Sequence, residues 1–102
     1  MAKVNGYRIY LLEIDNALRR ITGISDACTV VFENSCRKKI VSFIISSCQY
    51  EKKYIKKVLL EELPTYMLPY DIVFVDCFPE TINGKIDKKI LIENYEKTIS
   101  NK

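Results

Sequence analysis

At the centre of the sequence, Cys28–Phe32 (CTVVF) and Ile40–Ile45 (IVSFII) are two short runs rich in β-branched and aromatic residues. Such runs favour strands, because branched side chains pack well on a pleated surface. The polar segment Glu33–Lys39 separates them, and its Asn34-Ser35 pair is typical of a turn. We therefore predict two strands that pair with each other in antiparallel orientation.

Helices are predicted on both sides of this pair. Apolar residues of Leu11–Ile21 recur at the three- and four-residue spacing of an amphipathic helix, and Gly23 provides a helix stop. A second helix is predicted over Glu51–Leu63, because its apolar residues share one face and Pro64 disfavours helical geometry in the preceding residue.

The last third of the chain predicts one more strand and one more helix. Ile72–Val75 is a short apolar run, and Asn83-Gly84 is a strong turn signal. A short helix is expected after Asp87, whose carboxylate can cap it. We therefore predict an α+β fold in which a small sheet of about three strands packs with two to three helices.

Composition excludes several classes of protein. At 102 residues the chain is expected to be a single small domain. It has no histidine, which excludes Ser-His triads and histidine-ligated zinc, and its three glycines cannot form a glycine-rich phosphate loop. The apolar run Ile40–Ser47 is far shorter than the roughly 20 residues that span a bilayer. No targeting peptide is visible after Met1, so a cytoplasmic protein that does not bind membranes is expected.

Charge and cysteine content point to no further ligand. The net charge of +3 is mild, and acidic residues interrupt the lysine clusters, so nucleic acid is not an expected partner. The four cysteines, Cys28, Cys36, Cys48 and Cys77, are widely spaced and form no C-x-x-C pair. We expect them to be buried apolar side chains rather than metal ligands or disulfides.

Three further stretches carry a resemblance to a known family. They are Lys3–Ile9 (KVNGYRI), Leu63–Pro69 (LPTYMLP) and Phe78–Asp87 (FPETINGKID). The first of them is followed by Glu13–Asp15 (EID), which belongs to the same resemblance. They resemble segments of the small C-terminal subdomain of the adenylate-forming (AMP-binding) enzyme superfamily. The resemblance covers nearly all of residues 3–92. The sequence of these stretches is most similar to that of nonribosomal peptide synthetase adenylation domains and D-alanine–carrier-protein ligases. Acyl-CoA synthetases and luciferase-like enzymes stay open as alternative branches of the superfamily.

The resemblance implies that residues 1–102 are a single C-terminal lid subdomain with a post-hinge loop at 3–10 and a catalytic lysine loop at 79–87. Such a lid belongs to an ATP-dependent ligase that activates an amino acid or another acid and then passes it to a thiol. ATP and Mg would be bound mainly by a large N-terminal adenylation subdomain, so the chain alone would be inactive. The acceptor would be a phosphopantetheine thiol of a carrier protein, or coenzyme A.

The resemblance also assigns residues. Lys85 matches the adenylation lysine, and Asn83 and Gly84 would shape the turn that delivers it. Lys3, Gly6 and Arg8 match the loop that lines the route of the thiol arm, where a glycine lets backbone approach closely.

Two positions depart from the peptide synthetase pattern, and other functions stay open. Tyr10 stands where that pattern prefers glutamate, and Leu12 where it prefers glycine. The alternative is a free-standing, non-catalytic interaction module that binds a carrier protein; a basic nucleic-acid-binding domain is a third hypothesis. The activated acid, the oligomeric state, and whether the chain is an excised fragment or a natural short protein are left open by the sequence.

Overall fold

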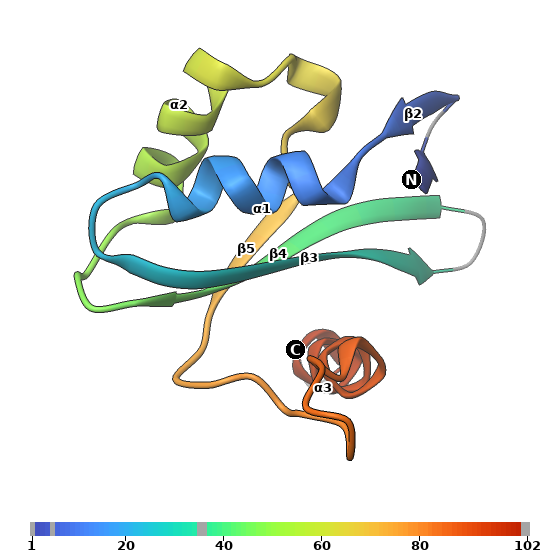
Figure 1. The fold of residues 1–102 in the computed structure, drawn as a ribbon. Helices are drawn as coiled ribbons and strands as arrows, with labels where there is room; N and C mark the ends of the chain where they lie inside the picture. Colours follow the sequence, from blue (N-terminus) through green and yellow to red (C-terminus); the bar gives the residue numbers. More distant parts are fainter. Residues whose placement is uncertain (1, 5, 35–36, 101–102) are drawn as a thin grey trace.

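A three-stranded mixed sheet forms the centre of the fold, a computed structural model that describes residues 2–4, 6–34 and 37–100 (Figure 1). Its strands are β3 (Ile24–Asn34), β4 (Arg37–Ser46) and β5 (Asp71–Phe74), in the order β3-β4-β5. Strands β3 and β4 are antiparallel, whereas β4 and β5 are parallel. The predicted α+β class, the strand pair and the third strand are confirmed.

The two central strands are longer than the apolar runs that predicted them. Their register places Cys28 opposite Phe43 and Thr29 opposite Ser42, so successive residues alternate between the two faces of the sheet. The register shifts between Ile24 and Asp26. At this irregularity the Ser25 hydroxyl donates a hydrogen bond to the Ile45 carbonyl at 3.2 Å.

Helices α1 (Leu11–Arg19) and α2 (Lys52–Glu62) cover one face of the sheet. The residues that form this half of the core are Ile9, Ile14, Ala17, Leu18, Ile21, Ile24, Ala27, Ile40, Ile44, Ile55, Leu59, Met67 and Ile72. Helix α1 ends before the predicted Ile21. Gly23, with φ +92°, instead lies in the turn before β3, where an added Cβ would come within 2.7 Å of Cys48 Sγ.

Helix α3 (Lys88–Ser100) covers the opposite face, with 13 residues rather than the short helix expected. It buries Leu91 and Tyr95 against Phe32 and Phe43, and the Tyr95 ring meets these two rings edge-on at centroid distances of 5.0 and 6.3 Å. The sheet is therefore sandwiched between two separate helical layers.

The crossover from β4 to β5 runs through α2 and a 3₁₀ turn at Thr65–Met67. Parallel neighbours require such a connection, because a tight hairpin joins only antiparallel strands. Among the described residues no helix has both the length and the apolar character needed to cross a bilayer.

The segment 3–10, expected as a loop, contains regular structure. Strands β1 (Ala2–Val4) and β2 (Tyr7–Ile9) form an antiparallel hairpin, in which Lys3 pairs with Arg8. The sequence does not predict this hairpin, because three-residue strands are too short to show an alternating pattern. Strand β2 leads directly into α1, so the position of that helix sets the position of the hairpin.

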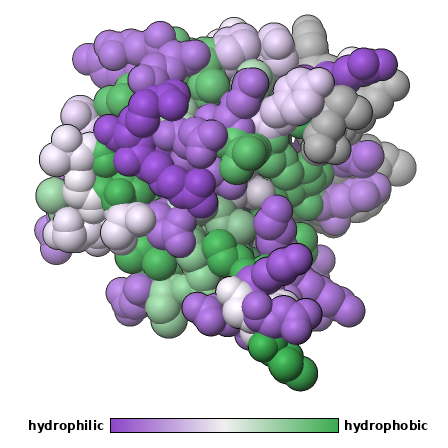
Figure 2. Space-filling view, viewed as in Figure 1, coloured by the Kyte–Doolittle hydropathy of each residue, from purple (hydrophilic) through white to green (hydrophobic). Residues whose placement is uncertain are grey.

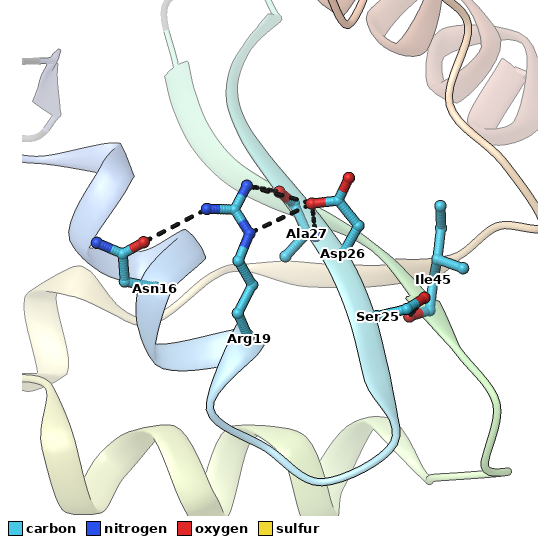
Figure 3. A network of polar contacts seen from close by, with 6 residues as sticks. All are labelled: Asn16, Arg19, Ser25, Asp26, Ala27 and Ile45. Carbon is cyan, nitrogen blue, oxygen red and sulfur yellow. Dashed lines mark hydrogen bonds and ion pairs between the residues drawn. The ribbon is translucent and has the colours of Figure 1, made fainter.

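Arg19, in the last turn of α1, ties this helix to the edge strand β3 (Figure 3). Its guanidinium donates to the Ala27 carbonyl at 3.1 Å, to Asp26 Oδ1 at 3.2 Å and to Asn16 Oδ1 at 3.3 Å. The bond to Ala27 occupies one backbone carbonyl of this edge strand. The guanidinium bonds also hold α1, and with it the hairpin, against the sheet.

The cysteine prediction is wrong for two of the four residues. Cys28 is buried in β3, but Cys48 and Cys77 are exposed, and Cys36 lies outside the described residues. Cys48 follows the end of β4 and Cys77 follows β5, where the chain has left the core. A thiol is small and weakly hydrophobic, so these connecting segments expose it at little energetic cost.

Candidate functional site

The lysine loop, residues 79–87, is a small hairpin between β5 and α3. At its base, the Asp87 N–H donates to the Pro79 carbonyl at 2.7 Å, and Glu80 forms an antiparallel bridge with Ile86. Ile86 packs against the core cluster that α3 covers. The base of the loop is therefore fixed by both backbone hydrogen bonds and apolar packing.

The tip of the loop is closed by two more backbone hydrogen bonds. The Thr81 N–H donates to the Lys85 carbonyl at 2.7 Å, and the Gly84 N–H donates to the Thr81 carbonyl at 2.9 Å. Gly84 has φ +80°, a conformation that glycine adopts without strain. Asn83 is exposed and makes no side-chain hydrogen bond within the described residues, so the backbone and Gly84 set the shape of this turn.

The Lys85 side chain extends from this fixed turn into solvent. It is exposed and makes no ion pair or hydrogen bond with the side chains of residues 2–4, 6–34 and 37–100. An ammonium group that is not already paired can neutralise an anion supplied from outside the chain. Lys85 is the exposed cation of this loop.

Helix α3 begins directly behind the loop, as the sequence predicts. Asp87 Oδ1 accepts a hydrogen bond from the Ile90 N–H at 3.2 Å, which is the geometry of a helix N-cap. The expected cap is confirmed. Because the cap lies only two residues after Lys85, the rigid helix and the lysine loop are mechanically joined.

The β1–β2 hairpin carries the other three predicted site residues. Lys3 and Arg8 are paired across it; Arg8 is exposed, while the Lys3 side chain lies outside the described residues. Gly6 is exposed with φ +85°, and no atom lies within 4 Å of the position that its Cβ would occupy. Within this chain, glycine is therefore needed there for the backbone conformation and not for lack of room.

The structure does not bring the two groups of predicted residues together. The β1–β2 hairpin lies beside α1 on one side of the sheet, and the lysine loop lies beside α3 on the other (Figure 1). Lys85 therefore cannot act at the same time and place as Gly6 and Arg8 on a small substrate held by this chain. The lysine loop and the β1–β2 hairpin are therefore two separate surfaces of this chain.

A cavity of about 310 Å³ lies next to the lysine loop, between β5 and α3. Apolar side chains line most of it. At its edge, the polar groups of Lys52 and Tyr95 form hydrogen bonds with Asp71. Asp71 accepts hydrogen bonds from Lys52 at 3.1 Å and from the Tyr95 hydroxyl at 3.0 Å. No local sequence pattern signalled this contact, because 24 residues separate Asp71 from Tyr95.

The ionisation of this pair follows from its surroundings. Burial acts to raise the pKa of Asp71, but hydrogen bonds from Lys52 and Tyr95 and the Lys52 charge together outweigh it and hold that pKa below its ordinary value. Burial, followed by the hydrogen bond to Asp71, raises the pKa of Tyr95 to about 12. The pair is a structural link between α3 and β5 rather than an acid–base site for neutral pH.

Comparisons with known proteins agree with this architecture. Bacitracin synthase 3 of Bacillus licheniformis is 40% identical over 92 residues, which are 89% of this chain and 1% of that protein. AMB antimetabolite synthetase AmbB of Pseudomonas aeruginosa is 37% identical over 90 residues, 87% of this chain and 7% of that protein. The chain thus spans only a small part of the curated relatives that it matches.

Solved structures are similar over most of the chain. A four-domain nonribosomal peptide synthetase bound to AMP and glycine is 37% identical with a TM-score of 0.79, over 87% of this chain and 7% of that one. A fatty acyl CoA synthetase of Mycobacterium tuberculosis has a TM-score of 0.85 at 22% identity, over 96% of this chain and 20% of that one, and shares the fold. The AMP-binding enzyme C-terminal domain family itself matches residues 13–85, so this chain belongs to that family of C-terminal domains of adenylate-forming enzymes.

Proposed function

We propose that this chain is the lid subdomain of an ATP-dependent ligase that activates an amino acid or a related carboxylic acid and transfers it to a thiol. The lysine loop serves the first half-reaction and the β1–β2 hairpin serves the second. The observation that carries the proposal is the exposed Lys85 ammonium, unpaired within the described residues, on a turn that three backbone hydrogen bonds hold in shape. The partner is a large N-terminal adenylation subdomain that binds ATP and the acid.

In the first half-reaction, a carboxylate oxygen of the acid attacks the α-phosphorus of ATP, and pyrophosphate leaves with the bonding electron pair. Negative charge concentrates between the carboxylate and the α-phosphate as they approach. The Lys85 ammonium neutralises this charge, since it is a compact cation on a flexible stem. Gly84 and the backbone hydrogen bonds of Thr81 hold the turn from which Lys85 reaches the partner subdomain, and Asn83 lies within that turn.

In the second half-reaction, the thiol sulfur attacks the carbonyl carbon of the acyl-adenylate, AMP leaves, and the thiol proton is released. The lid turns so that the β1–β2 hairpin faces the same pocket in place of the lysine loop. The exposed Gly6 backbone and Arg8 then border the path of a phosphopantetheine arm on a carrier protein. Lys3, paired with Arg8 in the hairpin, belongs to the same surface.

Magnesium enters this proposal only through the partner subdomain. Among the described residues, no three His, Cys, Asp or Glu side chains lie together as a group that could hold a metal ion. The part of the chain that the structure describes therefore does not fit a metal site, and the lid's own chemistry involves no metal-bound step. What the chain itself contributes is the ammonium and the two docking surfaces.

A chimera tests the proposal. The C-terminal subdomain of the glycine-bound peptide synthetase, which is 37% identical to this chain, is replaced by this chain, and glycine-dependent ATP–pyrophosphate exchange is measured. The expected result is exchange well above that of the enzyme without any C-terminal subdomain. Lys85→Ala lowers it by about 10²–10³, the usual effect of losing one oriented group that stabilises transition-state charge.

The matched control is Lys89→Ala, which removes another exposed lysine from the adjoining helix. It is expected to retain exchange within about twofold, since surface substitutions are usually near neutral. A chimera no more active than the truncated enzyme, or equal losses for the two lysine variants, would contradict the proposal. Binding of a carrier protein by the inactive chimera would then favour a non-catalytic interaction module.

A further inference from the structure

Ile82 at the tip of the lysine loop is completely exposed. Its relative accessibility is 105%, whereas other exposed aliphatic side chains, such as Leu12 at 64% and Leu60 at 49%, keep part of their surface against the chain. Figure 2 shows an apolar projection at the end of the molecule where Figure 1 has the loop between β5 and α3. No contact within the described residues accounts for an isoleucine here.

An isoleucine at a turn tip is chemically unusual. Turn tips favour glycine, proline, asparagine, aspartate and serine, and the neighbours Thr81, Asn83 and Gly84 are of the polar or glycine type. A branched aliphatic side chain gains free energy only when something removes it from water. None of residues 2–4, 6–34 and 37–100 does so for Ile82, which leaves its side chain available to another surface.

The geometry of the loop links Ile82 to Lys85. Both residues lie within the turn that the Thr81–Lys85 and Gly84–Thr81 backbone hydrogen bonds close. A surface that receives the Ile82 side chain therefore also fixes the backbone from which the Lys85 ammonium extends. Because the solved relative with a TM-score of 0.85 is about five times longer than the chain, which covers 20% of it, most of its surface lies outside this subdomain.

We propose that Ile82 is an apolar anchor that enters an apolar recess of the N-terminal adenylation subdomain when the lysine loop docks. The recess lies beside the place where the carboxylate meets ATP, so that burial of Ile82 sets the position of Lys85. Ile82 is thus a positioning residue, since it acts through Lys85 and touches neither substrate. This inference rests on the proposed function and adds a second, hydrophobic contact to it.

The test uses the chimeric enzyme, in which this chain replaces the C-terminal subdomain of the peptide synthetase, and four variants of it. Ile82→Ser is expected to lower the rate constant of adenylate formation by about tenfold or more, which corresponds to at least about 1.4 kcal/mol, within what burial of such a side chain provides. The KM for ATP stays within about twofold, because the partner subdomain binds ATP. Ile82→Leu restores the rate to within about threefold, because it keeps the apolar volume.

Two controls separate anchoring from a fold defect. Leu60→Ser, which removes an exposed aliphatic side chain from α2, is expected to leave adenylate formation unchanged. Ile82→Ser is expected to leave the Tm of the chain itself unchanged, because the side chain has no contact to lose. Thiol transfer from preformed adenylate is also unchanged, because it uses the β1–β2 hairpin.

The outcomes distinguish this inference from the proposed function. Loss of adenylate formation in Ile82→Ser with rescue by Ile82→Leu supports the anchor. Full activity of Ile82→Ser beside a Lys85→Ala variant that is impaired overturns the anchor and leaves the role of Lys85 intact. Full activity of both variants overturns the proposed function and the anchor together. An equal loss in both half-reactions of Ile82→Ser also overturns the anchor, since a positioning role is confined to the first.

Discussion

Replacement of Tyr95 by phenylalanine tests the link between α3 and the sheet. The substitution removes the hydroxyl that donates to Asp71 at 3.0 Å, while the ring keeps its edge-on contacts with Phe32 and Phe43. Asp71 retains its hydrogen bond from Lys52. The change therefore isolates one hydrogen bond between the helix that follows the lysine loop and strand β5.

The expected loss of stability follows from the nature of this bond. A hydrogen bond to a charged group contributes about 1.5–3 kcal/mol. The Asp71 side chain is 26% exposed, so water replaces part of the interaction and the lower end of that range applies. We expect the free energy of unfolding to fall by about 1–2 kcal/mol, and Tm by about 5–10 °C for a domain of this size.

The pH dependence provides a second, independent signature. The pKa of Tyr95 is raised to about 12 in the folded chain, against about 10 for an unfolded tyrosine. The neutral hydroxyl therefore stabilises the fold fully below about pH 10, and this contribution is lost as the pH rises through about 12. The stability difference between the wild type and Tyr95→Phe should narrow over that interval.

Urea unfolding followed by circular dichroism measures both effects. A double-mutant cycle with Asp71→Asn should return a coupling energy of about 1 kcal/mol, since the two residues are in direct contact. Tyr10→Phe, which removes a hydroxyl from an exposed tyrosine, is the matched control and should be neutral. A Tyr95→Phe variant within about 0.5 kcal/mol of wild type at pH 7 would refute the reasoning.

Two further predictions concern carboxylates of the helices. Asp87→Ala should lower the free energy of unfolding by about 0.5–2 kcal/mol in urea denaturation because α3 loses its N-cap, while Asp87→Asn should retain it; equal losses in the two variants would argue against the cap. Burial raises the pKa of Asp15, opposed more weakly by Thr29 and Arg19, and Asp15 Oδ1 has no hydrogen-bond partner within the described residues. Wild type should therefore lose stability relative to Asp15→Asn as the pH rises from below 3.8 through the raised pKa, and parallel pH profiles of denaturation would contradict this.

Most of the fold could be predicted because its elements have strong local patterns. Each of four elements can be recognised from its own residues alone: β3 and β4 by their apolar runs, and α1 and α2 by their helical periodicity. The parallel pairing of β5 with β4 could not be predicted, since it depends on residues such as Val41 and Asp71 that lie far apart in the sequence. The β1–β2 hairpin was missed because its strands are too short for a pattern.

Part of the candidate site could also be predicted from local patterns, and part could not. The motif around Asn83-Gly84 predicts a turn and an exposed lysine, and the turn is held by backbone hydrogen bonds that such residues permit. The exposure of Ile82 could not be predicted, because folded proteins also expose apolar side chains and no local pattern tells which ones. The Tyr95–Asp71 contact depends on how α3 lies on the sheet, which no local pattern specifies.

We propose that the lysine loop serves adenylate formation and that the β1–β2 hairpin serves thiol transfer. The most direct test compares both half-reactions in the Lys85→Ala variant of the chimeric enzyme. Adenylate formation is measured in a single turnover with ATP and the acid, and thiol transfer is measured separately from adenylate supplied preformed. The account predicts a loss of about 10²–10³ in the first rate and a second rate within about twofold of wild type. Equal losses in both rates, or none in the first, would contradict it.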